Sequence, residues 1–424
     1  MHAMRRLPSS VTLKIDLLFE GVRYTPALSA AMDHAFRNHY PYRFAEGEED
    51  PTGTGQAAIP FLLQLADGTL IRIMGRKESP YHVVQVGAGY ELRHDRGDAW
   101  PITFAPRHDW VLGTCTDGQP MSQIGLELLG DLLVVNLAPG CQFFTLPKRD
   151  GRPQRCAFCL YGRPDARSAA LGQDMDSPLL PEWSLRRMQE GINAAVAEGR
   201  VRHVYLVAGC LADPEQEAQR YLQLARAVRE GCPDVPYLSC GSGALPESAL
   251  RTLHAEQLVD GVCFNLEVHG EDLFRLVCPG KATHYGYDFW IRSLEQAVGL
   301  WGMGNVYSAM VAGIELEPQI VELELEPAVE RALAGAEDLV GRGILPIYSL
   351  YLPLYGKDHY RTLLALREYF GRVSLGYQEI RQAHGLTFNP AFMCRGCSYM
   401  QVECDLDDPP QTSVPSISAP ADRS

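Results

Sequence analysis

The sequence of 424 residues carries a formal net charge of -14 and has an isoelectric point near 5.3. Hydrophobic residues at 46% and charged residues at 21% are typical of a soluble globular protein. The acidic balance argues against a broad phosphate-binding surface, so we expect a small molecule or a peptide as substrate and no nucleic acid.

A chain of this length predicts two or three domains, although an α/β barrel can extend over about 250 residues as one unit. We expect no membrane helix, because no stretch approaches the run of about 18 apolar residues that such a helix needs. Lys14 and Asp16 interrupt the first apolar stretch, so it does not resemble a secretory segment. Without an export signal, the 12 cysteines predict a cytoplasmic protein with metal or redox chemistry and no disulfide framework.

The pattern of strand and helix signals in residues 1–130 predicts a small α+β domain. Apolar and polar residues alternate over Val11–Phe19, which is typical of a half-buried strand. Two further strands, Leu63–Ala66 and Thr69–Ile73, flank an Asp67–Gly68 hairpin turn. One helix is expected near Pro26–Tyr40.

Residues 131–376 alternate between short buried-strand patterns and amphipathic helical patterns. The strand patterns are Leu132–Leu137, Val201–Val207, Pro236–Cys240, Gly261–Leu266, Asn305–Val311 and Ile344–Leu350. The helical patterns are Ser184–Glu198, Glu215–Glu230, Glu247–Glu256, Asp288–Gly299 and Ala328–Arg342. Six such units without a glycine-rich phosphate loop predict an α/β fold, and an open or closed barrel suits them better than a dinucleotide-binding sheet. In barrels the chemistry lies at the C-terminal ends of the strands.

A cysteine group follows the first of these strands. Cys141 lies four residues beyond Leu137, and Cys156 and Cys159 form a Cys-x2-Cys pair downstream. Three thiolates can hold a 4Fe-4S cluster and leave one iron open for a small chelating ligand, which indicates an enzyme and not an electron carrier. The alternatives are two buried cysteines near a loop, or half of a zinc site.

With these residues the chain resembles the radical S-adenosylmethionine (SAM) superfamily, whose partial (β/α)6 TIM-type barrel carries a three-cysteine cluster after its first strand. The resemblance implies such a partial barrel for residues 131–376. In that family a Cys-x3-Cys-x2-Cys motif with an aromatic residue before the last cysteine is usual. Phe158 matches the aromatic residue, and Cys156 and Cys159 match the closing pair. Fourteen residues separate Cys141 from Cys156 where three are usual, so the resemblance is to an atypical member.

The resemblance also implies where SAM binds. Ala208 and Gly209 match a glycine segment at the end of the second strand, which binds the SAM amino group in the family. The carboxylate of that family segment is missing in this sequence. Backbone carbonyls are therefore expected to bind the amino group. Asn265 and Glu267, two residues apart on the fourth strand, match a segment that supplies polar contacts. Val311 and Gly313 match the apolar motif that packs against adenine.

The activity implied by the resemblance is reductive cleavage of SAM at the cluster, followed by radical modification of a small molecule or peptide. An external electron donor such as flavodoxin or ferredoxin would reduce the cluster. Two alternatives stay open: transfer of a 3-amino-3-carboxypropyl group by the same cluster, and a non-catalytic iron-sulfur or zinc protein. Oxidoreductase and transferase are both open as the enzyme class.

A second cysteine group, Cys394, Cys397 and Cys404, lies in an extension predicted over residues 377–406. It suits an auxiliary iron-sulfur cluster, a structural zinc, or a reactive or merely structural group of cysteines. Residues 407–424 are rich in Pro, Ser and Asp and are expected to be disordered. Cys210, Cys240 and Cys263 are interpreted as small buried residues, and Lys281 has no assigned role.

Overall fold

The computed structural model describes residues 7–33, 39–44, 46–105, 108–159, 162, 165–174, 177–241, 243–351 and 359–408. The chain divides into two compact units, and each takes residues from separate stretches of the sequence. The N-terminal unit comprises Met1–Arg107, Leu363–Gln378 and Arg395–Ser424, and the barrel unit comprises His108–Thr362 and Glu379–Cys394. The boundaries at residues 130, 376 and 406 stay predictions, and the predicted tail from residue 409 onward lies outside the described residues.

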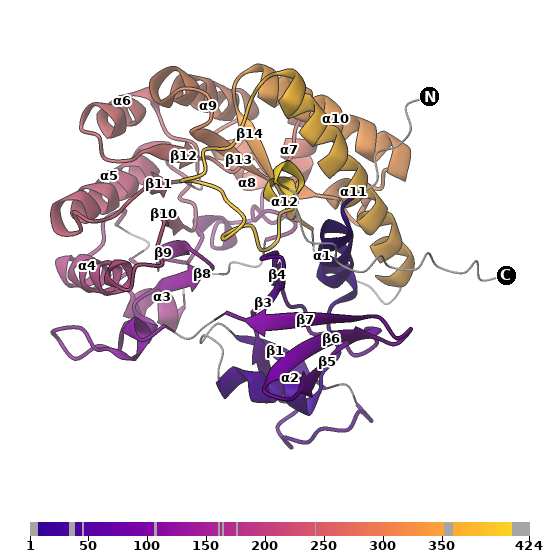
Figure 1. The fold of residues 1–424 in the computed structure, drawn as a ribbon. Helices are drawn as coiled ribbons and strands as arrows, with labels where there is room; N and C mark the ends of the chain where they lie inside the picture. The colour runs from indigo at the N-terminus through magenta and orange to yellow at the C-terminus, as the bar shows by residue number, and fades with distance from the viewer. Residues whose placement is uncertain are drawn as a thin grey trace. The chain divides into compact units, whose positions relative to one another are not determined.

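The barrel unit is built on a curled seven-stranded sheet with the order β14-β13-β12-β11-β10-β9-β8 (Figure 1). Its strands are β8 (Leu126–Leu129), β9 (Leu132–Ala138), β10 (His203–Ala208), β11 (Leu238–Cys240), β12 (Gly261–Cys263), β13 (Val306–Ala312) and β14 (Leu345–Leu350). Strands β9 to β14 pair in parallel and in sequence order, and β8 is antiparallel to β9. Six parallel strands in this order fit a partial TIM-type barrel, and each of them overlaps a strand predicted from the sequence.

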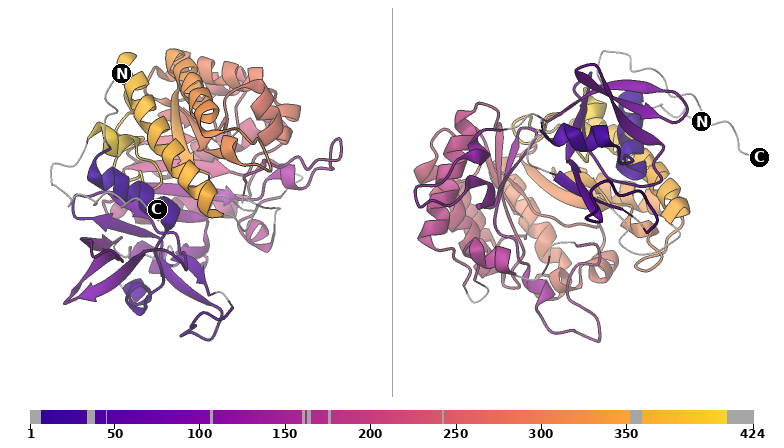
Figure 2. Two further views of the ribbon diagram at one scale, coloured as in Figure 1. Left: turned by 90° about the vertical axis from the view of Figure 1, so that its right-hand side faces the viewer. Right: turned by 90° about the horizontal axis from the view of Figure 1, so that it is seen from below.

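Helices cover the outer side of this sheet (Figures 1 and 2). The barrel unit contains α3 (Ala166–Ala170), α4 (Glu182–Ala197), α5 (Pro214–Gly231), α6 (Glu247–Ala255), α7 (Glu271–Val277), α8 (Pro279–His284), α9 (Tyr287–Trp301) and α10 (Leu325–Gly341). Short 3-10 turns occur at Trp110–Leu112, Met121–Gln123, Gln142–Phe144 and Ile314–Leu316. Met188 and Ile192, one turn apart on α4, are fully buried, as an amphipathic helix on a sheet requires. The five helices predicted for this region are therefore present as α4, α5, α6, α9 and α10.

The N-terminal unit has a five-stranded antiparallel sheet with the order β4-β3-β7-β6-β5 and a separate two-stranded ribbon. Its strands are β1 (His39–Arg43), β2 (Gln56–Pro60), β3 (Leu62–Leu65), β4 (Leu70–Arg72), β5 (Tyr81–Val86), β6 (Gly89–His94) and β7 (Ala99–Phe104). Its helices include α1 (Ser9–Glu20), α2 (Pro26–Ala30), a 3-10 turn at Ala31–Asp33 and α12 (Glu403–Asp407), and α11 (His359–Ala383) supplies residues to both units. The predicted hairpin is confirmed, because β3 and β4 pair around Gly68, which has a φ of +88°.

The strand predicted over Val11–Phe19 is wrong, because these residues lie in the helix α1. Val11, Leu13, Lys14 and the whole run from Ile15 to Phe19 are buried, so the helix is enclosed on nearly all sides. A helix that is buried all round has no polar face to reveal a 3.6-residue period, and its sequence can imitate a strand.

The helix expected near Pro26–Tyr40 is shorter than predicted. It begins as expected, with Thr25 as an N-cap whose side chain accepts a hydrogen bond from the Leu28 amide. It ends at Ala30, and by His39 the chain is in strand β1.

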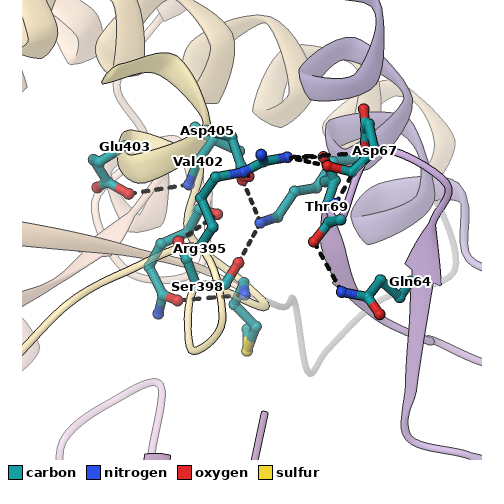
Figure 3. A network of polar contacts seen from close by, with 12 residues as sticks. Gln64, Asp67, Thr69, Arg395, Ser398, Val402, Glu403 and Asp405 are labelled. Carbon is teal, nitrogen blue, oxygen red and sulfur yellow. Dashed lines mark hydrogen bonds and ion pairs between the residues drawn. The ribbon is translucent and has the colours of Figure 1, made fainter. Parts of the chain in front are cut away.

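The C-terminal segment of the N-terminal unit is held by buried charges (Figure 3). Arg395 donates to the Asp67 carbonyl and to the Thr69 hydroxyl, both at 3.0 Å, and its Nε is 3.3 Å from Asp405 Oδ1. Asp405 also accepts from Lys14 Nζ at 2.7 Å, with both side chains fully buried. Arg395 therefore fixes the last described segment of this unit to the β3–β4 hairpin, a role that its position between two cysteines does not reveal.

Candidate functional site

The first cysteine of the candidate site lies just past the end of β9. Cys141 is the N-cap of the 3-10 turn Gln142–Phe144, and its amide donates to the Gly162 carbonyl at 3.1 Å. The preceding residue, Gly140, is held by one side chain: Gln173 Oε1 accepts from the Gly140 amide and Gln173 Nε2 donates to its carbonyl, both at 2.7 Å. Gln173 is buried, so this paired contact is shielded from water and fixes the backbone beside Cys141.

Replacing Gln173 by Ala is expected to loosen this loop. The variant leaves the buried Gly140 amide and carbonyl without their partner, which costs about 1–3 kcal/mol of unfolding free energy. Gln223 makes the same reciprocal pair with the Leu180 backbone, at 2.8 and 2.9 Å, and Gln223→Ala is therefore a matched control. Urea unfolding should detect a loss in both variants, whereas the iron bound per chain after reconstitution should fall only in Gln173→Ala. Equal iron in the two variants would contradict a positioning role for Gln173.

The long gap between Cys141 and Cys156 is folded back on itself. Arg149 and Arg152 form a bridge across a tight turn in which Asp150 and Gly151 both have positive φ, 50° and 76°. The Gln154 side chain closes the next turn by donating to the Pro147 carbonyl at 2.9 Å. The extra residues thus form a local excursion, and the chain returns to the end of the barrel that carries Cys141.

The segment with Cys156 and Cys159 is bound to the junction of α7 and α8. The Ala157 amide donates to the Val277 carbonyl at 2.8 Å, and the Gly280 amide donates to the Gln154 carbonyl at 2.9 Å. Only glycine fits at position 280, because a Cβ there would lie 2.4 Å from the Gln154 oxygen. The Cys159 amide closes a turn onto the Cys156 carbonyl at 3.2 Å, and Phe158 lies half-buried within that turn.

The segment after β10 packs directly against the Cys141 loop. A Cβ on Gly209 would lie 2.4 Å from the Gly140 oxygen, so this close approach requires glycine, and Ala208 before it is buried. The Gln142 amide donates to the Cys210 carbonyl at 2.9 Å. Cys210 and Cys141 consequently pack in one small cluster with Phe143.

Four thiols therefore gather at this end of the barrel: Cys141, Cys156, Cys210 and Cys278, all buried and none in a disulfide. Burial, with a smaller contribution from Cys156, raises the pKa of Cys141 to about 12. A hydrogen bond with Cys278, together with burial, raises the pKa of Cys156 well above its ordinary value. A metal that binds here must displace the protons of the thiols that ligate it.

A buried cation completes the group. Lys281 is almost fully buried, and its Nζ donates to Glu267 Oε1 at 2.8 Å and to the Asn265 carbonyl at 2.7 Å. Burial alone would lower the pKa of Lys281, but Glu267 and the neighbouring thiols raise it well above its ordinary value. Thiol ligands beside a fixed positive charge are a donor set that fits an iron-sulfur centre, whose thiolates and sulfides are anionic.

Asn265 and Glu267 lie just beyond the end of β12, and not within it. Glu267 has a left-handed backbone with a φ of 73°, which is uncommon for a residue other than glycine. Its amide donates to the Ala309 carbonyl and its carbonyl accepts from the Val311 amide, so the segment stays attached to β13. Left-handed backbone at a non-glycine residue is a strained feature that occurs often at ligand sites.

The other residues matched to the SAM motifs are at the end of β13. Val311 is half-buried in the strand. Gly313 follows it with a φ of 95°, in the left-handed conformation, and starts the 3-10 turn Ile314–Leu316. Glycine is required at this position by its backbone conformation.

One carboxylate at this site was not recognised in the sequence. Glu217, in the first turn of α5, is fully buried, and its Oε2 accepts from the Leu211 amide at 2.8 Å. Its Oε1 lies against Gly243 and has no hydrogen bond of good geometry to the described residues. Burial raises the pKa of Glu217, and Arg220 opposes that rise. The charge of Glu217 acts on both Cys141 and Cys210, so this carboxylate belongs to the same site.

The second cysteine group is divided between the two units. Cys394 ends a segment of the barrel unit, and its thiol donates to Asp131 Oδ2 at 3.0 Å. Cys397 and Cys404 are buried in the N-terminal unit. The auxiliary-cluster, zinc and structural interpretations of these three cysteines all stay open.

Comparison with known proteins bears on the family. No protein-family model matches the chain. A bacteriochlorophyllide c C-7(1)-hydroxylase of Chlorobaculum limnaeum is 22% identical over 263 residues, which cover 59% of this chain and 60% of that protein. A 5-amino-6-(D-ribitylamino)uracil--L-tyrosine 4-hydroxyphenyl transferase 2 of Methanosarcina acetivorans is 22% identical over 202 residues, 45% of this chain and 47% of that protein. Both are radical SAM enzymes. The chain is a relative of the radical SAM enzymes.

The resemblance inferred from the cysteine motif is thus confirmed at the level of the superfamily. The chain spans about 60% and 47% of the lengths of these two relatives, so the activities in their names are stated only of them. A solved radical SAM methyltransferase from Sphaerobacter thermophilus aligns over 73% of this chain and 76% of its own, with 15% identity and a TM-score of 0.39. The partial barrel is inferred from the strand order and from the parallel pairing of β9 to β14. Among the described residues, no helix is long and apolar enough to cross a membrane.

Proposed function

We propose that the protein is a radical SAM enzyme whose 4Fe-4S cluster is held by Cys141, Cys156 and Cys159. The observation that carries the proposal is the convergence of the Cys141 loop and the Cys156 segment at the C-terminal end of the barrel strands, beside the buried Lys281. Barrel enzymes carry their chemistry at that end. When bound and reduced, the cluster supplies the electron that cleaves a carbon-sulfur bond of SAM.

The residues of the chain then bind and orient SAM. Asn265 and Glu267 would supply polar contacts, Val311 and Gly313 would pack on the adenine, and Ala208 and Gly209 would offer their backbone. Lys281 holds the Glu267 side chain in one orientation, which supports a fixed polar contact there. Phe158 would cover the cluster from the turn between Cys156 and Cys159 and would help to exclude water.

Glu217 is our candidate for the carboxylate that the segment after β10 lacks. Its Oε1 faces the Gly243 backbone and is buried close to Cys141 and Cys210, where an ammonium group would be a favourable partner. The α-amino group of SAM is such a cation. Binding of the SAM amino group is therefore assigned to Glu217 on α5, the helix that follows β10.

The substrate is proposed to be a small molecule or a peptide, and the reducing electron to come from a donor such as flavodoxin or ferredoxin. Transfer of a 3-amino-3-carboxypropyl group is the second candidate, because the unusual gap before Cys156 alters the loop around the cluster. A non-catalytic iron-sulfur or zinc protein is the third. The fully buried carboxylate of Glu217, close to the cysteines, supports a ligand-binding site over a carrier.

Product analysis separates these candidates. The reconstituted protein is incubated anaerobically with SAM and dithionite, and the nucleosides are identified by chromatography and mass spectrometry. The proposed radical enzyme forms 5'-deoxyadenosine, and the transferase forms 5'-methylthioadenosine. A fully iron-loaded protein that forms neither would be a carrier and would contradict the proposal.

Glu217→Gln tests the role of the buried carboxylate. Gln keeps the acceptor for the Leu211 amide but removes the charge, so the dissociation constant for SAM should rise roughly 10- to 150-fold, which corresponds to about 1.5–3 kcal/mol. Iron content should not change. Glu190→Gln on α4, where the carboxylate bonds the exposed Thr116, is the control. Calorimetric titration with SAM gives the constants, and equal values for both variants would make Glu217 purely structural.

A further inference from the structure

We infer that the basic loop over residues 147–155 is the docking surface for the acidic protein that reduces the cluster. The loop occupies most of the gap between two of the proposed cluster ligands, and its cations are Lys148, Arg149, Arg152 and Arg155. The inference rests on the proposed function, because it assigns a docking site to the electron donor of that reaction. One electron passes from the reduced flavin of a small acidic carrier such as flavodoxin to the cluster, and no bond is made or broken.

The charge of the basic loop is opposite to that of the whole chain. Four of its nine residues are cations and Asp150 is its one acid, so four minus one gives a formal charge of +3, whereas the chain carries -14. All four cationic residues are exposed. A concentrated positive surface on an otherwise acidic protein attracts an acidic partner to one place, and like charges disfavour its approach elsewhere.

Three of these cations have no partner of opposite charge in the part of the chain that the structure describes. Lys148, Arg149 and Arg152 form no ion pair there. Exposed arginines of the outer helices are by contrast paired within their own helices: Arg186 with Glu182, Arg251 with Glu247, and Arg275 with Glu271. The loop cations are therefore available to the acidic side chains of another protein.

The basic loop is fixed at its base and at its tip. At the base, the buried Gln154 donates to the Pro147 carbonyl at 2.9 Å, and its Oε1 is 2.9 Å from His284 Nε2. At the tip, Arg149 and Arg152 exchange two backbone hydrogen bonds of 3.0 and 2.9 Å. A loop that is already ordered loses little conformational entropy when a partner binds to it.

The base of the loop lies next to the cysteines. Arg155 immediately precedes Cys156. The guanidinium carbon of Arg155 is 5.5 Å from the ring centroid of Phe144, which lies three residues past Cys141. Electron transfer between proteins requires a short path, and a carrier docked on this loop would be close to two of the proposed cluster ligands. Electron-transfer complexes have small interfaces, below about 1,200 Å² in total, so one loop can form a large part of such a surface.

A small anionic ligand and a nucleic acid fit these observations less well. Small ligands bind in concave sites that bury most of their surface, whereas the four cations of the loop are exposed. Nucleic acid binding depends on many phosphate contacts over a broad positive surface, and the net charge of -14 opposes it. An acidic protein needs only a local positive patch.

The test compares two triple variants of the full chain that have the same net charge of -17, which is -14 minus three. The loop variant removes three unpaired cations and keeps the backbone hydrogen bonds of the loop: Lys148→Gln, Arg149→Gln and Arg152→Gln. The control variant removes three exposed cations on the side of the barrel where the parallel strands begin: Arg202→Gln, Arg226→Gln and Arg342→Gln.

Calorimetry gives the dissociation constant of oxidised flavodoxin with each apoprotein at ionic strengths of about 0.01 and 0.15 M, where the Debye length is about 30 and 8 Å. At the lower ionic strength the loop variant should bind about tenfold more weakly than the wild type, and the difference should shrink at the higher one. The control variant should bind like the wild type. After reconstitution, the second-order rate constant of cluster reduction by reduced flavodoxin should fall in the loop variant alone. Reduction by the small uncharged 5-deazaflavin radical should be equally fast in all three proteins.

Equal affinities of the loop and control variants for flavodoxin would overturn the inference and leave the proposed function intact. Slow reduction of the loop variant by 5-deazaflavin would also overturn it, because the loop would then act on the cluster itself. Loss of affinity for a single-stranded oligonucleotide, with flavodoxin binding unchanged, would assign the loop to nucleic acid instead. Absence of any cluster in the reconstituted wild type would refute the proposed function.

Discussion

Cys156→Ala is expected to abolish both the 4Fe-4S cluster and all cleavage of SAM. Cys156 belongs to the cysteine group, with Cys141 and Cys210 as electrostatic neighbours. Two remaining thiolates cannot hold a cubane that needs three protein ligands. Cys141→Ala and Cys159→Ala should behave in the same way, as measured by iron content, visible absorbance and nucleoside products.

The control for these variants is Cys232→Ala. Cys232 is just as buried but lies next to Gln189 on another part of the barrel unit, so its replacement should leave the iron content at the wild-type level. Full activity in any one of the Cys141, Cys156 or Cys159 variants would remove that residue from the set of ligands. Retention of activity in Cys159→Ala together with its loss in Cys210→Ala would mean that Cys210 takes the third position.

Lys281→Met should strongly destabilise the protein. The variant leaves the largely buried carboxylate of Glu267, whose side chain is 11% exposed, without its cation. Breaking a buried ion pair by removing one partner costs about 3–5 kcal/mol. Chemical denaturation of the apoprotein gives the unfolding free energy without any contribution from a metal. Glu267→Gln in the same chain removes the orphaned charge, and the double variant should recover a substantial part of the loss.

Arg251→Met provides the comparison for that experiment. Arg251 pairs with Glu247 on α6, but both side chains are largely exposed, so the expected loss is below about 1 kcal/mol. If Lys281→Met cost no more than Arg251→Met, the Lys281–Glu267 contact would not be a fixed buried pair. The proposed role of Lys281 in orienting the Glu267 side chain would then be contradicted.

The barrel was largely predictable from the sequence because its signals are local. Parallel strands buried on both faces appear as short apolar runs, and the amphipathic helices between them separate one strand from the next. All six strands, from β9 at Leu132 to β14 at Leu350, were found in this way. The helix α1 was missed for the opposite reason, because a helix buried on nearly all sides carries no amphipathic signal.

The cysteine motif was predictable for a similar reason, since Cys156, Phe158 and Cys159 lie in one short segment. Glu217 and Cys278 were not, because Glu217 approaches the site from α5 and Cys278 from the α7–α8 junction, both through long-range contacts. Cys210 appeared to be a small core residue since it follows an apolar strand. A signal did exist for Glu217: the segment Ala208–Gly209 lacks a carboxylate, and a buried acid close downstream is a candidate to replace it.

In the proposed function, three cysteines hold a cluster with one open iron that binds SAM. Low-temperature electron paramagnetic resonance of the dithionite-reduced, reconstituted protein tests it directly, with spectra recorded before and after addition of SAM. We expect the signal of a reduced 4Fe-4S cluster and a change in that signal when SAM binds. A fully loaded cluster with the same spectrum in the presence and absence of saturating SAM would contradict it.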